Sequence, residues 1–123
     1  MTGHLLVEHF MPFRLGFIQY RLQLLRQELE RLLEELPALG ALKVILIGDL
    51  LTDNITPSSI IDLIIVHDTD LSYLERIDFF ISHLRPIVGV QISPLTPSEY
   101  SGLESTNLTL FNKIDPEQIL YES

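Results

Sequence analysis

The sequence predicts an α/β or α+β domain in which helices flank a small mixed β-sheet. Three observations predict this fold class: a long helical pattern lies near the start, two short β-branched runs follow it, and a second helical pattern precedes a third run. The second run is apolar on both faces, so helices are expected to cover the sheet. Residues 1–123, of which 46% are hydrophobic, have the size of a single domain with one substantial core.

The long helical pattern predicts an amphipathic helix that begins at Phe13 and stops at Pro37 and Gly40. Apolar residues recur three and four positions apart along it, which is the period of one helix face. They are Ile18, Leu22, Leu25, Leu29, Leu32 and Leu36. Their heptad rhythm is compatible with self-pairing of two such helices, and packing on the chain's own sheet is the alternative.

The opposite face of this helix is charged and is expected to meet water. Its residues are Arg14, Arg21, Arg26, Glu28, Glu30, Arg31, Glu34 and Glu35. The spacing of four residues between Arg26 and Glu30, and between Arg31 and Glu35, favours ion pairs that support a helix.

The remaining elements follow in order along the chain. Residues 44–47 predict a first strand, residues 48–59 a polar loop, and residues 63–66 a second strand that is buried on both sides. Residues 71–84 have helical period, with Asp70 or Ser72 available as the cap. Residues 87–92 predict a third strand and residues 98–100 a short helical turn. A short helix or strand over residues 107–114, a turn over residues 115–118 and an apolar tail over residues 119–121 complete the prediction.

Composition excludes several classes of function. The chain has 8 Lys and Arg against 17 Asp and Glu, a formal charge of −9, so a nucleic-acid backbone would be repelled. The absence of Cys excludes disulfide, thiolate and redox chemistry and fits a cytoplasmic protein. No apolar run approaches the roughly 20 residues that span a bilayer, and the start reads poorly as a signal peptide. We therefore expect a soluble, cytoplasmic protein without a nucleic-acid or membrane partner.

The segment that carries chemistry is residues 48–62. Gly48-Asp49 follows the first strand, ten residues intervene, and Ile60-Ile61-Asp62 leads directly into the second strand. This spacing resembles the minimal nucleotidyltransferase family, in which a strand ends in Gly-Ser, ten residues follow, and an Asp-x-Asp pair opens the next strand. The tail Ile119-Leu120-Tyr121-Glu122 is similar to the sequence on which many family members finish.

The resemblance implies a metal-dependent site whose chemistry this chain has lost. The resemblance assigns Gly48 and Asp49 to nucleotide binding. It places Ile60 and Asp62 at the positions of the paired carboxylates, and Gln91 at the position of the third carboxylate. Residues i and i+2 of a strand share a face, which is how such a pair holds Mg²⁺. An isoleucine cannot ligate a hard cation, an aspartate at position 49 would oppose a phosphate, and the amide of Gln91 supplies no charge. Only Asp62 remains as a metal ligand, and its pKa should rise if it is buried without donors.

We therefore expect no catalysis and no cofactor, and instead a nucleotidyltransferase-like domain that binds another protein. The resemblance suggests a helical HEPN-type partner, with this chain as antitoxin or scaffold of a toxin–antitoxin module; a homodimer through the long helix is a variant. The expected contact surface combines that helix with Leu5, Leu6, Val7, Phe10, Met11 and Phe13, which could equally pack on the chain's own core.

Two alternatives retain a ligand. In one, Asp49 and Asp62 bind Mg²⁺, with Asp53 as a third ligand, and the protein transfers a nucleotide from ATP. In the other, the protein is a sensor that binds a nucleotide without turning it over. The histidines do not add a metal site, because His4, His9, His67 and His83 lack zinc-site spacing and are expected at the surface or half-buried.

Overall fold

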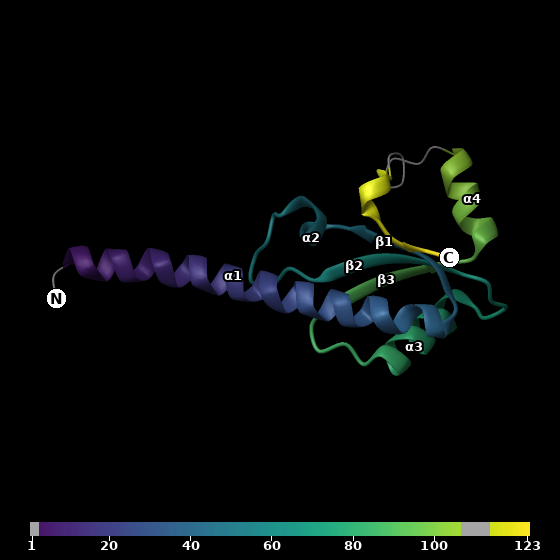
Figure 1. The fold of residues 1–123 in the computed structure, drawn as a ribbon, viewed down its shortest axis with the longest axis horizontal. Helices are drawn as coiled ribbons and strands as arrows, with labels where there is room; N and C mark the ends of the chain where they lie inside the picture. The colour runs from purple at the N-terminus through teal and green to yellow at the C-terminus, as the bar shows by residue number, and fades with distance from the viewer. Residues whose placement is uncertain (1–2, 107–113) are drawn as a thin grey trace.

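The computed structural model describes the backbone of residues 3–106 and 114–123, and the side chains of residues 16–105 and 114–123. It shows a mixed α/β fold of the α+β kind, as the sequence predicts. Four strands form one sheet in the order β3-β2-β1-β4 (Figure 1). They are β1 (Ala41–Ile47), β2 (Ile61–His67), β3 (Val90–Leu95) and β4 (Ile119–Glu122). β1 is antiparallel to both of its neighbours, whereas β2 and β3 are parallel.

Two helices cover one face of the sheet. α1 (Gly3–Glu35) contributes Leu25, Leu29 and Leu32, and the 3-10 turn η1 (Leu36–Leu39) that follows it contributes Leu36. α3 (Tyr73–Leu84) contributes Phe80 and Leu84. These side chains pack on Val44, Leu46, Leu63 and Ile65 of the two central strands. The predicted apolar stripe therefore packs on the chain's own sheet from Leu22 onward, because burying it there removes it from water.

The other face of the sheet is covered by α4 (Pro97–Thr106). Tyr100 of α4 packs on Ile45, Ile64 and Val66, which alternate along the strands with the residues of the first face. β2 is thus buried on both sides, as its continuous apolar sequence predicts. A 3-10 turn, η2 (Pro116–Gln118), leads into β4, and the predicted apolar tail is this edge strand.

Several predicted boundaries are wrong. Helix α1 begins at Gly3 and not at Phe13, and the third strand is shifted toward the C-terminus of residues 87–92. The polar segment after β1 contains a short helix, α2 (Asp49–Thr52), where Gly48 permits a sharp change of direction. Ser72 caps α3 in a capping box with Glu75. The helix or strand expected within residues 107–113 lies outside the described residues.

The charged face of α1 is only partly in water. Glu28 is 2% exposed, contrary to the prediction, because its carboxylate accepts hydrogen bonds from Arg31 and from the backbone N–H of Ile87. Arg31 also pairs with Glu35, as predicted, whereas Arg26 lies 3.7 Å from Asp53. The Glu28 cluster ties the C-terminal half of α1 to the segment that precedes β3. It is a long-range contact that helix periodicity cannot reveal.

Candidate functional site

The residues singled out in the sequence meet at one end of the sheet. In the β1–β2 register Ile47 faces Asp62, and in the β2–β3 register Asp62 faces Gln91. Gly48 follows Ile47 directly, so Gly48, Asp62 and Gln91 lie side by side across three strands. The strand register thus brings together positions that are up to 43 residues apart in the chain.

Gly48 makes this close approach possible. Its backbone has a φ of 80°, and a Cβ built on it would lie 3.1 Å from the Cβ of Asp62. Any other residue here would combine a strained backbone with a contact that forces Asp62 to move. Glycine at this position therefore brings the backbone at the end of β1 against the Asp62 side chain.

Asp49 is held by the loop that closes the site. Its Oδ2 accepts a hydrogen bond of 2.8 Å from the hydroxyl of Ser59, which is itself buried. The Ser59 hydroxyl accepts from the backbone N–H of Thr56, and the Ser59 carbonyl accepts two bonds from the Arg21 guanidinium. The Asp49 carboxylate is thus part of a network that fixes residues 56–59 against α1.

Asp62 is the carboxylate at the centre of the group. Burial raises its pKa above the usual value, and the nearby charge of Asp49 raises it further. Its Oδ1 is buried and has no hydrogen-bond partner among the described residues. The sequence predicts that the pKa of Asp62 rises if the residue is buried without donors. The structure shows a half-buried carboxylate whose ionised form is disfavoured.

Ile60 occupies the position that the resemblance assigns to the first metal ligand. Its side chain is half-buried and contacts Gly89, where an added Cβ would lie 2.6 Å from the Ile60 Cγ2. The backbone N–H of Ile61 also donates to the Gly89 carbonyl. The alkyl group therefore packs on the backbone just before β3 and offers no oxygen to a cation.

The donor set does not fit a pair of Mg²⁺ ions. Asp53 is exposed and lies near Arg26, so it does not join Asp49 and Asp62. No group of three or more His, Asp or Glu side chains able to hold a metal occurs within residues 16–105 and 114–123. The available oxygen atoms are those of Asp62, the amide of Gln91, and Asp49, which already accepts a hydrogen bond from Ser59. These are too few for the octahedral coordination of two Mg²⁺ ions.

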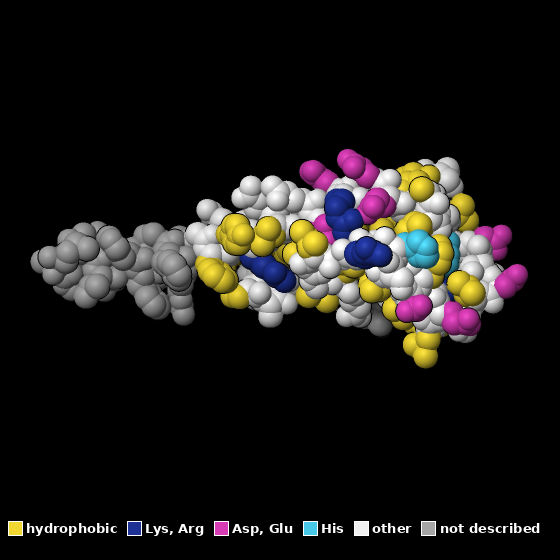
Figure 2. Space-filling view, turned by 90° about the horizontal axis from the view of Figure 1, so that it is seen from below, with side chains coloured by type: hydrophobic (Ala, Val, Ile, Leu, Met, Phe, Trp, Pro, Cys, Tyr) yellow, Lys and Arg dark blue, Asp and Glu magenta, His cyan; other side chains and the backbone are white. Residues whose placement is uncertain are grey.

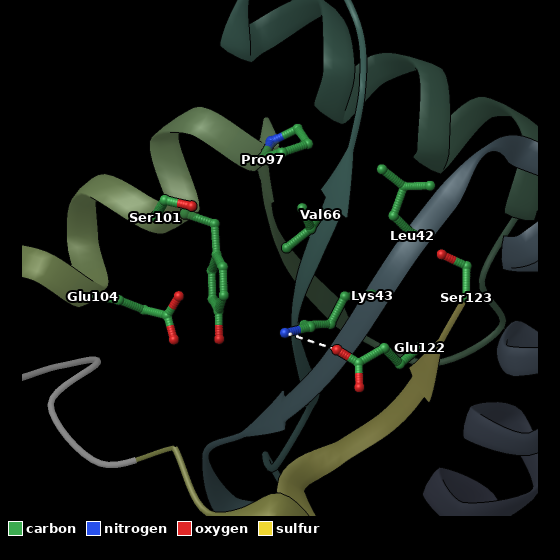
Figure 3. Close-up of a pocket in the computed structure, with 9 residues that line it drawn as sticks. Leu42, Lys43, Val66, Pro97, Ser101, Glu104, Glu122 and Ser123 are labelled. Carbon is green, nitrogen blue, oxygen red and sulfur yellow. Dashed lines mark ion pairs between the residues drawn. The ribbon is translucent and has the colours of Figure 1, made fainter.

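A separate cavity of about 300 Å³ opens between α4 and the sheet, at the opposite end of β2 (Figure 3). Val66 and Leu42 line it together with Glu104 of α4. Lys43 projects into it, lies 3.0 Å from Glu122, and has its ammonium 5.0 Å from the centre of the Tyr100 ring. The hydrogen bond to Glu122 raises the pKa of Lys43, so the lysine stays charged. Sequence patterns gave no signal for this cavity, because its lining comes from four separate elements.

His67 of β2 and Arg76 of α3 are buried polar residues whose burial the sequence did not predict. Arg76 donates to the carbonyls of Leu71 and Pro94 and to Glu99. His67 is buried, contrary to the expectation of a surface or half-buried position, and its ring packs edge-on against Phe80. Burial lowers the pKa of His67, and the positive charge of Arg76 lowers it further. The pair joins α3 to the sheet.

Two aromatic residues of α1 are exposed. Phe17 is 51% and Tyr20 is 60% exposed, and both lie just before Arg21, which bonds to Ser59. Hydrophobic side chains gather at this end of the described surface (Figure 2). The backbone of α1 continues beyond them, away from the rest of the fold (Figure 1). Leu5, Leu6, Val7, Phe10, Met11 and Phe13 belong to this continuation, and their side chains lie outside the described residues.

None of the described helices combines the length and apolar character that crossing a bilayer requires. Comparisons with family models, with curated proteins and with solved structures found no match for this chain.

Proposed function

We propose that this chain is a non-catalytic nucleotidyltransferase-like domain that acts by binding another protein. The resemblance of residues 48–62 to a nucleotidyl-transfer site supports the first half of the proposal, together with the convergence of Gly48, Asp62 and Gln91 at one end of the sheet. We assign the function to surfaces outside this site, because the site lacks the carboxylates that metal-dependent nucleotidyl transfer requires.

The single observation that carries the proposal is the environment of Ile60. Nucleotidyl transfer needs two divalent ions that neutralise charge on the phosphoryl oxygens. At the position of the first ligand an alkyl side chain packs on Gly89, and the neighbouring Asp49 is bonded to Ser59. A phosphate brought to this end of the sheet would meet two carboxylates without a compensating cation.

The protein-binding half rests on α1. A helix that leaves the body and carries exposed aromatic residues offers large, rigid contact surface at low entropic cost. The resemblance points to a helical HEPN-type protein as the partner class, with this chain in an antitoxin or scaffold role.

Titration calorimetry with ATP and Mg²⁺ tests the non-catalytic assignment. We expect no binding heat from the natural chain. The double variant Ile60→Asp, Asp49→Ser restores the spacing of the resembled motif and is the positive comparison, since it should gain affinity for Mg²⁺. Nucleotide transfer by the natural chain, or Mg²⁺-dependent ATP binding that Asp62→Asn abolishes, would disprove the proposal.

A metal-dependent transferase is the second candidate, and one observation favours it. The charge of Asp49 acts on Asp62, so two carboxylates lie close enough to interact. Carboxylates that share a cation show this kind of coupling before the ion binds. A Mg²⁺ titration followed by amide chemical shifts separates the candidates, because a shared site would move the Gly48, Asp49 and Asp62 signals together.

A further inference from the structure

The cavity between α4 and the sheet has a floor made of one row of the sheet (Figure 3). Lys43 of β1 lies opposite Glu122 of β4 in one register and opposite Val66 of β2 in the other. Side chains that face each other on neighbouring strands project to the same side of the sheet. The floor therefore presents a carboxylate, an ammonium and an alkyl group in a line, and Leu42 adds a second alkyl group to the lining.

One face of α4 forms the opposite wall. Pro97, Tyr100 and Glu104 recur three and four residues apart, so they share a helix face, and all three line the cavity. The Lys43 ammonium lies 5.0 Å from the centre of the buried Tyr100 ring. Figure 3 shows the carboxylates of Glu104 and Glu122 on either side of this ammonium. Helix period and strand register together bring these groups to one cavity.

The polar lining carries charges of both signs that act on one another. The Lys43 ammonium lies 3.0 Å from the Glu122 carboxylate, and the charges of Glu122 and Glu104 both act on it. An ammonium group has three donors, so the pair with Glu122 leaves donors for a ligand. Lys43 is the one cation among the described lining residues, beside two carboxylates. A ligand in this cavity would therefore meet an ammonium and a carboxylate within one small volume.

We propose that this cavity binds a free amino acid with an aliphatic side chain. The ligand carboxylate accepts hydrogen bonds from Lys43, and the ligand ammonium donates to Glu104, because Glu122 is already paired with Lys43. The alkyl side chain packs on Val66 and Leu42, which removes it from water. At about 300 Å³ the cavity lies at the lower end of the range for small-molecule sites, which fits a single amino acid.

Charge selects a zwitterion over ligands that carry a single charge. A simple amine would bring a second cation against Lys43, and a simple acid would bring a third carboxylate against Glu104 and Glu122. A zwitterion places an opposite charge beside each of these groups. The inference goes beyond the proposed function and does not depend on it, because the cavity and Asp62 lie at opposite ends of β2.

Binding of L-leucine to the full chain, followed by amide chemical shifts, tests the inference. We expect saturable shifts at millimolar concentration for Val66, Tyr100 and Ser101, which line the cavity. Isopentylamine lacks the carboxylate of leucine, and isocaproate lacks its ammonium. Each of these two probes should have a dissociation constant about tenfold higher or more, because each loses a hydrogen bond between charged groups.

Matched variants connect the binding to the named side chains. Lys43→Met keeps the apolar stem, removes the ammonium and should raise the dissociation constant for leucine by about tenfold or more. Its control is Arg26→Met, which removes the same charge from an exposed pair with Asp53 and should leave the affinity unchanged. Glu104→Gln should weaken leucine binding and leave isocaproate binding unchanged or improved, whereas Glu30→Gln at an exposed position of α1 should change neither.

Absence of saturable leucine binding, equal affinity for isopentylamine and leucine, or equal effects of Lys43→Met and Arg26→Met would overturn the inference. If Lys43→Met does not fold, Glu104→Gln decides, because Glu104 is exposed and its replacement leaves the core intact. An unchanged leucine affinity in that variant would refute the proposed contact. None of these outcomes bears on the calorimetric test with ATP and Mg²⁺.

Discussion

Replacing Asp62 by asparagine should stabilise the protein at neutral pH. Burial and the charge of Asp49 raise the pKa of Asp62, so folding disfavours its ionised form. Its Oδ1 is also buried without a partner among the described residues. Asparagine keeps the size of the side chain and removes the charge, at a position where Gly48 leaves no room for a larger group.

The expected gain follows from the extra cost of desolvating a charged carboxylate instead of a neutral amide, which is of the same order as the cost of an unsatisfied buried polar group, about 1–3 kcal/mol. The half-exposed position of the carboxylate and the polar atoms that remain in asparagine reduce it to about 1 kcal/mol. For a domain of this size, that gain corresponds to an increase of about 4 °C in the midpoint of thermal unfolding.

The gain should depend on pH in a defined direction. Because the folded-state pKa lies above the unfolded value of 3.8, protonated Asp62 favours folding, and this contribution is complete below pH 3.8. It is lost as the pH rises through the raised pKa. The free-energy difference between variant and natural chain should therefore be largest at neutral pH and shrink as the pH falls toward 3.8.

Urea unfolding of both proteins across this pH range measures the effect, with Asp70→Asn at an exposed site as the control. The control should change the unfolding free energy by less than about 0.5 kcal/mol. A variant that is less stable than the natural chain at neutral pH, or a difference that does not vary with pH, would refute the reasoning. Either result would mean that a donor reaches the ionised carboxylate in solution.

Three further predictions concern stability. Gly48→Ala should lower the unfolding free energy by about 1–3 kcal/mol, because of the positive φ of this position and the contact with Asp62. Gly102→Ala in α4, which has open space around it, should raise the unfolding free energy slightly. Chemical denaturation measures both effects. Glu28→Gln should lower the unfolding free energy by about 2 kcal/mol at neutral pH. Hydrogen bonds from Arg31 hold the pKa of Glu28 below 4.5, so this difference between variant and natural chain should disappear as the pH falls through the lowered pKa. Denaturant titrations at several pH values measure it. Because burial lowers the pKa of His67, its neutral form favours folding, and the stability of the protein should fall as the pH drops from 6.5 toward the lowered pKa. His67→Phe should reduce this dependence of stability on pH in thermal melts. An unchanged pH dependence would show that His67 does not cause it.

Local patterns determined most of the fold because they reflect short-range constraints. The apolar period of α1, the β-branched runs of β1 and β2, and the capping serine of α3 each act within one or two turns or along one strand. The element boundaries depended on more. The sequence predicts β4 only as an apolar tail, because its strand hydrogen bonds come from β1. It predicts Glu28 as a surface residue, because the backbone N–H of Ile87 that bonds to it lies far away in the chain.

The candidate site divides in the same way. The resemblance of residues 48–62 to a known motif suggested which positions lie together, and the antiparallel pairing of β1 with β2 brings the end of one strand to the start of the next. The states of those residues were not predictable, since the hydrogen bond from Ser59 to Asp49 and the packing of Ile60 on Gly89 depend on how the loop closes.

The sequence by itself determined the fold class, the acidic character and the absence of a carboxylate at positions 60 and 91, because residue type and period suffice for each. Only the tertiary structure decided that Asp62 is half-buried with an oxygen that has no partner among the described residues, and that Phe17 and Tyr20 of α1 are exposed. These properties depend on which surfaces remain after distant segments pack together, and no local pattern encodes that outcome.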